Sequence, residues 1–175
     1  MTPSSSSNAT LLSLGYKEAR TYLLALLFVA GNVVLPQLVH LIPRGGLVWL
    51  PIYFFTLVGA YKYGWRVGLL TAVASPLVNH LLFGMPPTAV LPAILTKSVL
   101  LAVAAGYAAH RWHKVTALTL LAVVAFYQGV GSLAEWGFTG SLMSALQDVR
   151  LGLPGMAVQV VGGLWVIGQL AKERD

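Results

Sequence analysis

The sequence predicts an all-α polytopic membrane protein, a single bundle of six transmembrane helices. Of its 175 residues, 57% are hydrophobic and 9% are charged, whereas a soluble domain carries about 25% charged residues. So few charges cannot coat a globule with hydrated side chains, and most of the surface must therefore face lipid. The apolar segments are long and continuous rather than alternating, which favours helices over a transmembrane β-barrel.

Six segments approach the roughly 20 residues that a helix needs to cross the hydrocarbon. In chain order they cover residues 20–40, 47–61, 65–83, 88–109, 115–133 and 151–171. The second is short, and Pro51 near its start predicts a kink or a tilt. The polar, uncharged beginning predicts a flexible tail over residues 1–18, followed by one transmembrane domain over residues 19–175.

The distribution of basic residues predicts the orientation. Alternate connectors collect on one side of the predicted bundle the residues Lys17, Arg20, Lys62, Arg66, Arg111, Lys114, Lys172 and Arg174. The other side holds Arg44 and Arg150. Because cytoplasmic loops carry the excess of Lys and Arg, both termini are expected in the cytoplasm. The long outer connector predicts a short amphipathic helix over residues 139–149.

Lys97 is the most informative residue, because it lies at membrane depth. It follows the turn Gly84-Met85-Pro86-Pro87 and falls about nine residues, roughly 13 Å, into the fourth segment. A cation so deep needs a partner or a water-filled cavity. Two interpretations stay open: a structural ion pair or carbonyl contact, and a ligand or transport role. Glu135 is the obvious internal partner, but its place near the outer end of the fifth segment argues against a direct contact.

Other polar residues in the outer halves of the segments are weaker candidates for a binding site. Asn79 and His80 lie near the outer end of the third segment, and Gln128 and Gln159 lie in the outer halves of the fifth and sixth. Each of them has a structural alternative, since such side chains also form hydrogen bonds between membrane helices. Arg44 is either a solvated loop charge or the cap of an outer pocket that attracts an anion.

Several chemistries are not indicated. The sequence has no phosphate-binding loop, no H-E-x-x-H zinc motif and no G-x-S-x-G nucleophile turn. It has no cysteine, and its histidines are divided between the two sides, so that no single site collects all four. We therefore expect neither an enzyme nor a protein that binds a metal or another cofactor.

A series of motifs lies within residues 50–87. The apolar second segment ends at Tyr63-Gly64, and the glycine-bearing run Val67-Gly68-Leu69-Leu70 follows it. Ser75-Pro76 and Gly84-Met85-Pro86 then mark the outer part of the third segment and the turn after it. With these motifs, six spans and both ends inside, the chain resembles the S components of energy-coupling factor (ECF) transporters, the vitamin-capturing subunits of that class.

The resemblance implies an S-component-like bundle in the bacterial (inner) cell membrane. Such a subunit binds a micronutrient in an outward-facing pocket and docks on a transmembrane T component. Two cytoplasmic ATPases drive that component, so ATP is used by the partner subunits and not by this chain. The S component then topples in the membrane and releases its cargo inside. A carboxylate such as biotin, pantothenate or lipoate and a large ring system such as cobalamin both remain open as cargo.

The resemblance also implies which residues form the sites. In the family, the outer halves of the later helices form the pocket and the first outer loop closes it. The corresponding pocket residues are Lys97, Asn79, His80, Gln128, Glu135, Trp136 and Gln159, with Arg44 in the closing loop. Docking on the T component uses small residues of the first helix, here Ala25, Ala30 and Gly31. Ala25 and Ala30 depart from the four-residue spacing that is common in the family.

A second class of function stays open beside this one. The chain is alternatively a stand-alone secondary transporter or a small integral membrane enzyme. Secondary transporters contain discontinuous helices, which Pro51, Pro76 and Pro92 would allow, and internal repeats, which the two halves of this sequence do not show. Transport in the absence of any T component would distinguish the two classes.

Overall fold

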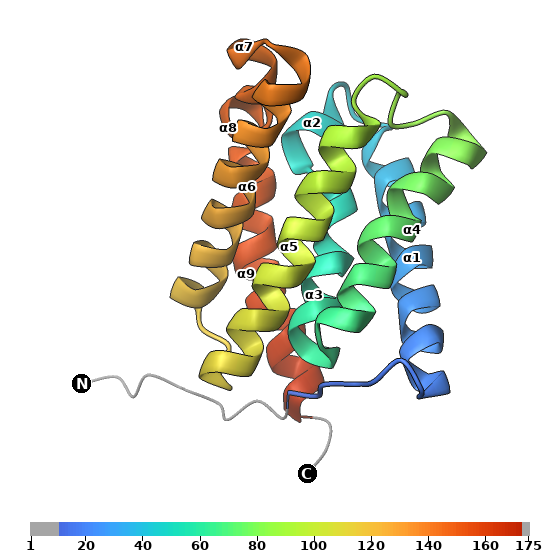
Figure 1. Cartoon of the computed structure of the whole chain (residues 1–175), viewed down its shortest axis with the longest axis vertical. Helices are drawn as coiled ribbons and strands as arrows, with labels where there is room; N and C mark the ends of the chain where they lie inside the picture. The colour runs from blue at the N-terminus through green and yellow to red at the C-terminus, as the bar shows by residue number, and fades with distance from the viewer. Residues whose placement is uncertain (1–10, 173–175) are drawn as a thin grey trace.

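The computed structural model describes residues 11–172, a range in which every regular element is helical (Figure 1). Five helices are long and apolar enough to cross a membrane: α1 (Ala19–Val39), α4 (Trp65–Phe83), α5 (Leu91–Trp112), α6 (Ala117–Thr139) and α9 (Leu153–Lys172). The shorter elements are α2 (Gly45–Trp49), the 3₁₀ turn η1 (Pro51–Tyr53), α3 (Phe54–Tyr63), α7 (Leu142–Ala145) and α8 (Gln147–Leu151). The protein is therefore membrane-embedded and all-helical.

The second predicted segment is not one continuous helix, and five helices in the described part of the chain are long and apolar enough to cross a membrane, so the prediction of six spans is not confirmed. α2 ends at Trp49, and Leu50 adopts a left-handed conformation with φ of 46° before Pro51 begins η1. A proline disfavours the α conformation in the residue before it, so the chain breaks here rather than kinking. The remaining helix, α3, has only 10 residues.

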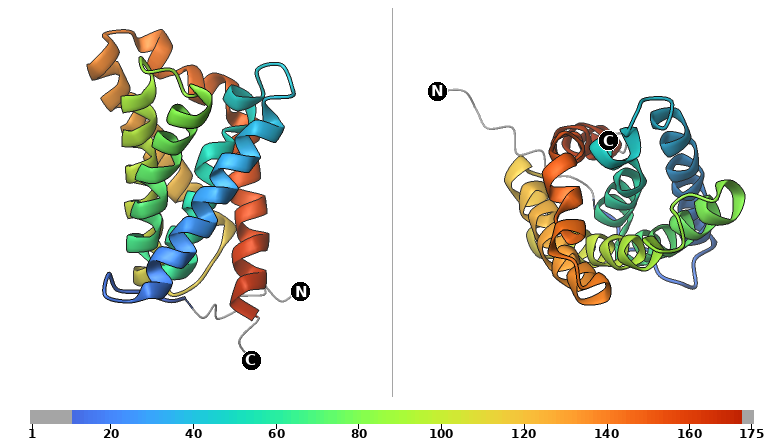
Figure 2. Two further views of the ribbon diagram at one scale, coloured as in Figure 1. Left: turned by 90° about the vertical axis from the view of Figure 1, so that its right-hand side faces the viewer. Right: turned by 90° about the horizontal axis from the view of Figure 1, so that it is seen from above.

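α3 lies at the centre of the bundle, and the long helices surround it (Figure 2). All its residues from Thr56 to Lys62 are buried. Close packing is possible because Gly68 of α4 has no side chain: a Cβ there would lie 2.3 Å from the Cβ of Ala60 on α3. The outer surfaces of the long helices remain apolar, as at Leu23 and Leu26 of α1, each 67% exposed.

Asn32 of α1 ties its helix to α3 and α4. Its side-chain amide donates to Thr56 Oγ1 at 3.0 Å and to Ser75 Oγ at 3.1 Å, while its carbonyl oxygen accepts from Phe55 N at 3.2 Å. Buried polar groups in a membrane protein need such internal partners, because lipid offers none. Asn79 extends the network by donating to the backbone oxygens of Asn32 and Ser75, both at 2.9 Å.

The two ends of the bundle differ in charge. The start of α1, the α3–α4 junction, the α5–α6 connection and the end of α9 lie at one end, which we call the basic end (Figure 1). α2, α7 and α8 lie at the opposite end, which we call the far end and which carries Arg44 and Arg150. Apart from Arg174, which lies outside the described residues, the two groups of basic residues that the sequence analysis separated therefore fall at opposite ends of one bundle.

The described part of the expected tail, residues 11–18, packs on the basic end. Leu12 N donates to Lys62 O at 2.9 Å, and Leu14 N donates to Tyr63 O at 3.1 Å. These bonds pair two of the carbonyl groups that the end of α3 would otherwise leave without partners. Residues 1–10 lie outside the described part of the chain.

We predict that Gly68→Ala destabilises the protein, because the new methyl group would overlap Ala60. Overpacking of this kind costs about 1–3 kcal/mol of unfolding free energy. Gly129→Ala is the matched control, since a Cβ at Gly129 meets nothing within 4 Å, and it should be neutral or slightly stabilising. Thermal unfolding of the detergent-solubilised variants measures both effects. Equal melting temperatures for the two variants would show that the α3–α4 contact is looser than described.

Candidate functional site

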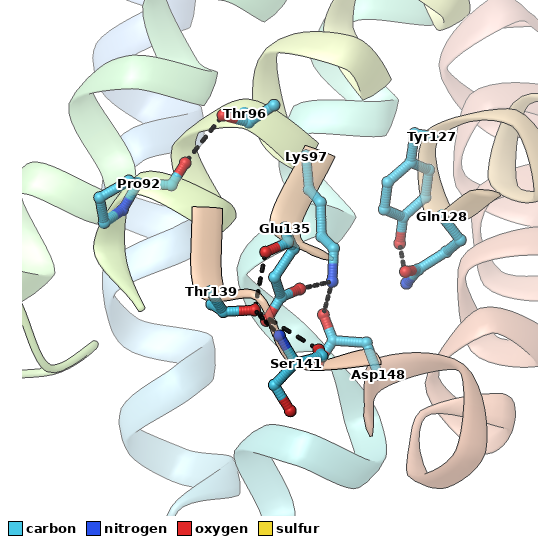
Figure 3. Close-up of polar contacts among 9 residues, drawn as sticks. All are labelled: Pro92, Thr96, Lys97, Tyr127, Gln128, Glu135, Thr139, Ser141 and Asp148. Carbon is cyan, nitrogen blue, oxygen red and sulfur yellow. Dashed lines mark hydrogen bonds and ion pairs between the residues drawn. The ribbon is translucent and has the colours of Figure 1, made fainter. Parts of the chain in front are cut away.

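Lys97 of α5 forms two ion pairs at the far end of the bundle (Figure 3). Its ammonium group donates to Glu135 Oε2 of α6 and to Asp148 Oδ2 of α8, each at 2.7 Å. The lysine side chain is 1% exposed, that of Glu135 11% and that of Asp148 17%. The cation is thus the innermost member of a three-residue cluster whose carboxylates lie nearer to the surface.

Glu135, the obvious internal partner, does contact Lys97 although its depth argued against a direct contact, and Gly131 supplies the reason. A Cβ at Gly131 would lie 2.5 Å from Lys97 Cγ, so the absent side chain lets the lysine stem lie directly on α6. The four-carbon stem then carries the ammonium group along α6 to Glu135, about one helical turn farther toward the far end. Depth along the helix axis alone did not account for the length of the lysine side chain.

Asp148 is a site residue that the sequence analysis missed. A signal for it exists, because the sequence has only five acidic residues and Glu135 and Asp148 are the two on the far side of the predicted bundle. A buried ammonium group must find its counter-charge among them. The predicted amphipathic helix over 139–149 is resolved into α7 and α8, and α8 contributes the carboxylate.

The cluster has an unbalanced formal charge: one ammonium at +1 and two carboxylates at −1 each give −1. A further anion could not join it without displacing one of the carboxylates. Conversely, removing one partner of a buried ion pair leaves a charge uncompensated, which costs about 3–5 kcal/mol. The cluster therefore connects α5, α6 and α8, and it concentrates three charged groups at one place.

Polar side chains from η1, α6 and α9 extend the cluster inward. Tyr127 donates to Gln159 Oε1 at 2.8 Å and accepts from Gln128 Nε2 at 3.1 Å. The ring of Tyr53 lies 5.2 Å from that of Tyr127, and Tyr53 is within electrostatic range of Asp148 and Glu135. We call these side chains together the polar centre: Lys97, Glu135, Asp148, Tyr53, Tyr127, Gln128 and Gln159.

Five buried polar side-chain atoms have no hydrogen-bond partner within the described protein: Tyr53 Oη, Ser98 Oγ, Gln128 Oε1, Ser132 Oγ and Gln159 Nε2. Three of them belong to the polar centre, and Ser132 lies about one helical turn from Gln128 on α6. Each unpaired buried group costs about 1–3 kcal/mol. Such groups are rare in folded proteins unless water or a ligand completes them, so the atoms in the polar centre mark where water or a ligand would bind.

A cavity of about 570 Å³ lies beside the polar centre. Its walls are the end of α1, the segment leading into α2, part of η1 and the turn before α5, and its polar lining comes from His40, Arg44 and Asn79. η1 separates the cavity from the polar centre, because Pro51 and Ile52 line the cavity while Tyr53 packs on Tyr127.

The predicted site residues therefore divide into two groups and two exceptions. Lys97, Glu135, Gln128 and Gln159 meet in the polar centre, while Arg44 and Asn79 line the cavity. His80 contacts the turn instead, with its Nδ1 2.8 Å from Pro86 O. Trp136 is 47% exposed on the outside of α6. Among the described residues, no group of three or more histidine and acidic side chains is arranged to hold a metal ion.

The three predicted docking residues of α1 do not share an exposed face. Ala25 is buried, and Gly31 faces the bundle, where a Cβ would lie 2.8 Å from the ring of Phe55. Ala30 is exposed beside Leu26 and Leu27. Only Ala30 is thus available to a partner on this face.

Comparison with known proteins gives no relative: no family model, no curated protein and no solved structure matches this chain.

We predict that Lys97→Met lowers the unfolding free energy by about 3–5 kcal/mol, because Glu135 and Asp148 lose their shared cation. Adding Glu135→Gln and Asp148→Asn to this variant should restore most of the loss, since the remaining groups are uncharged. Melting temperatures of the detergent-solubilised single and triple variants measure this. A triple variant as unstable as Lys97→Met alone would show that packing around the lysine stem, and not charge, dominates.

Proposed function

We propose that the chain is the substrate-binding membrane subunit of an ECF-type importer. It captures a vitamin or similar micronutrient at the far end and delivers it inward together with a T component and two ATPases. The observation that supports this best is the presence of unpartnered polar atoms on Tyr53, Gln128 and Gln159 in the same polar centre as the buried Lys97. A protein that only had to fold would gain stability by replacing these groups with apolar side chains.

The position of the polar centre suits uptake. The cytoplasmic assignment of the basic end, which rests on the distribution of Lys and Arg, makes the far end the outer face of a bacterial inner membrane. The cavity is lined by the segment leading into α2 and by the turn before α5 at that end, and Lys97 is paired there with Asp148 of α8. Small-molecule sites of this kind combine apolar and aromatic walls with a few polar groups that fix orientation.

The cavity is a separate element of the same proposal. Its volume of about 570 Å³ falls within the roughly 300–1,000 Å³ of small-molecule pockets. Arg44 lies in its lining, where a guanidinium group attracts anions that approach from outside. We assign the cavity to the first encounter with the solute and the polar centre to specific binding.

The sequence has no phosphate-binding loop, which agrees with a subunit whose partners use the ATP. The apolar outer face of α1, with Leu23, Leu26 and Ala30, is the surface that we assign to the T component. This differs from the face expected from the resemblance, because Ala25 and Gly31 pack inside the bundle.

A stand-alone secondary transporter is the second candidate function. The observation that favours it is the ionisable cluster of Lys97, Glu135 and Asp148, since such groups within membrane helices mark ion pathways. We predict that cells making this chain without any T component do not accumulate the solute that co-purifies with it. Accumulation under these conditions would support the secondary transporter and overturn the importer.

We predict that Tyr53→Phe reduces the amount of solute that co-purifies with the protein while leaving its stability unchanged or higher. The hydroxyl group of Tyr53 has no hydrogen-bond partner within the protein, so its loss removes a cost from the fold but a contact from the solute. Mass spectrometry of small molecules released from the detergent-solubilised protein, beside its melting temperature, measures both.

Tyr61→Phe is the matched control, because the Tyr61 hydroxyl donates to Lys114 O at 2.6 Å at the basic end. It should lower the unfolding free energy by about 0.5–1.5 kcal/mol and leave solute retention unchanged. If the native protein retains no solute, the proposed capture of a micronutrient fails. If Tyr53→Phe retains as much solute as the native protein, the polar centre is not the site that holds it.

A further inference from the structure

Asp148 is the more exposed partner of its ion pair, and Lys97 is the more buried one. Lys97 is 1% exposed and its stem packs on Gly131, whereas Asp148 is 17% exposed. Asp148 lies on α8, a five-residue helix without a single buried residue, and α7 before it buries only Ala145. Besides the burial of Ala145 and the packing of Gly152 on Leu50, the ion pair with Lys97 joins the segment 140–152 to α5 (Figure 3).

The charge of the cluster restricts what can bind there. With the formal charge at −1, an additional carboxylate would raise the buried charge to −2, which the low dielectric of the site makes unfavourable. A carboxylate that takes the place of Asp148 leaves the buried charge at −1 and keeps the ammonium group paired throughout. The displaced Asp148 then moves into water, where a carboxylate is well solvated.

The unpartnered atoms of the polar centre can pair with a carboxylate. The hydroxyl group of Tyr53 and the amide nitrogen of Gln159 can each donate a hydrogen bond to it, as can the hydroxyl group of Ser132 on α6. A carboxylate has two acceptor oxygens, and its charge matches that of the Asp148 carboxylate that Lys97 now binds. An organic cation could also pair with the hydroxyl oxygens and with Gln128 Oε1, but it could not replace Asp148 on the lysine ammonium group.

We propose that the polar centre binds the carboxylate group of a small organic acid, which replaces Asp148 on Lys97 and thereby releases the α7–α8 segment. Asp148 acts as an internal substitute for the substrate carboxylate in the empty protein. The inference rests on the proposed function, because it identifies the substrate class and the regulation of that same site. The cost of displacing Asp148 lowers the apparent affinity for the substrate, and binding is coupled to opening of the far end.

Asp148→Asn tests the exchange with three probes of similar shape: benzoate, the uncharged benzamide and the cationic benzylamine. Shifts of melting temperature with probe concentration give apparent affinities for the detergent-solubilised protein. We expect benzoate to bind about tenfold or more tightly to Asp148→Asn than to the native protein, because its competitor is gone. Benzamide should not distinguish the two proteins. Arg150→Gln, on the same helix and exposed, should behave as the native protein does.

A second measurement follows the position of the α7–α8 segment directly, first without a ligand and then with benzoate. The sequence contains no cysteine, so spin labels can be attached at Arg150→Cys on α8 and at Thr88→Cys before α5 without further changes. Asp148→Asn should shift the measured distance distribution toward larger separations, and saturating benzoate should produce the same shift in the labelled native background. An unchanged distribution in Asp148→Asn would show that Asp148 does not hold the segment and would overturn the proposal.

The outcomes separate this inference from the proposed function. Weaker binding of benzoate to Asp148→Asn, or preferential binding of benzylamine to the native protein, identifies a cation site and overturns the exchange. If the native protein retains a solute that depends on Tyr53 but not on Asp148, the proposed function stands and the exchange fails. If no solute is retained while Asp148→Asn opens the segment and tightens benzoate binding, the exchange stands and the importer proposal fails.

Discussion

The far end of this protein depends on one constraint: an ammonium group within a membrane helix must be neutralised inside the protein. Lys97 meets this constraint with Glu135 and Asp148, at 2.7 Å each. Because these partners come from α6 and α8, satisfying one charge fixes the relative positions of three helices. The positions of Tyr53, Tyr127 and the two glutamines around that point follow from the same arrangement, and so does the excess negative charge.

A second constraint concerns the centre of the bundle. Lipid cannot pair backbone or side-chain polar groups, so polar residues must point inward. Asn32, Thr56 and Ser75 obey this rule by bonding to one another between α1, α3 and α4. In this network the buried polar side chains have hydrogen-bond partners, which join α1, α3 and α4 to one another. The polar centre, in contrast, keeps several donors and acceptors unpaired. A bound group would therefore find hydrogen-bond partners at the far end rather than in this network.

Much of the architecture could be predicted from the sequence, because long apolar segments and their basic flanks carry strong local signals. The five long helices and the grouping of basic residues at one end follow from those signals. The break at Leu50 and Pro51 was signalled only as a kink, since nothing local shows that α3 would be enclosed on all sides. Contacts made by long side chains were even harder to predict from the sequence than this break. The reach of Lys97 to Glu135 depends on the missing side chain of Gly131, and its contact with Asp148 depends on how the α7–α8 segment folds back.

The shortness of α3 has a consequence for biogenesis. Its 10 residues span about 15 Å, half of the roughly 30 Å hydrocarbon layer, and its last turn carries Lys62. Such a segment cannot partition into lipid as an independent helix, as α1 and α4 can. It is instead enclosed by neighbours that follow it in the chain, because α4, α5 and α9 complete its surroundings. The native environment of α3 is therefore complete only when the helices that follow it in the chain, α4, α5 and α9, have packed against it.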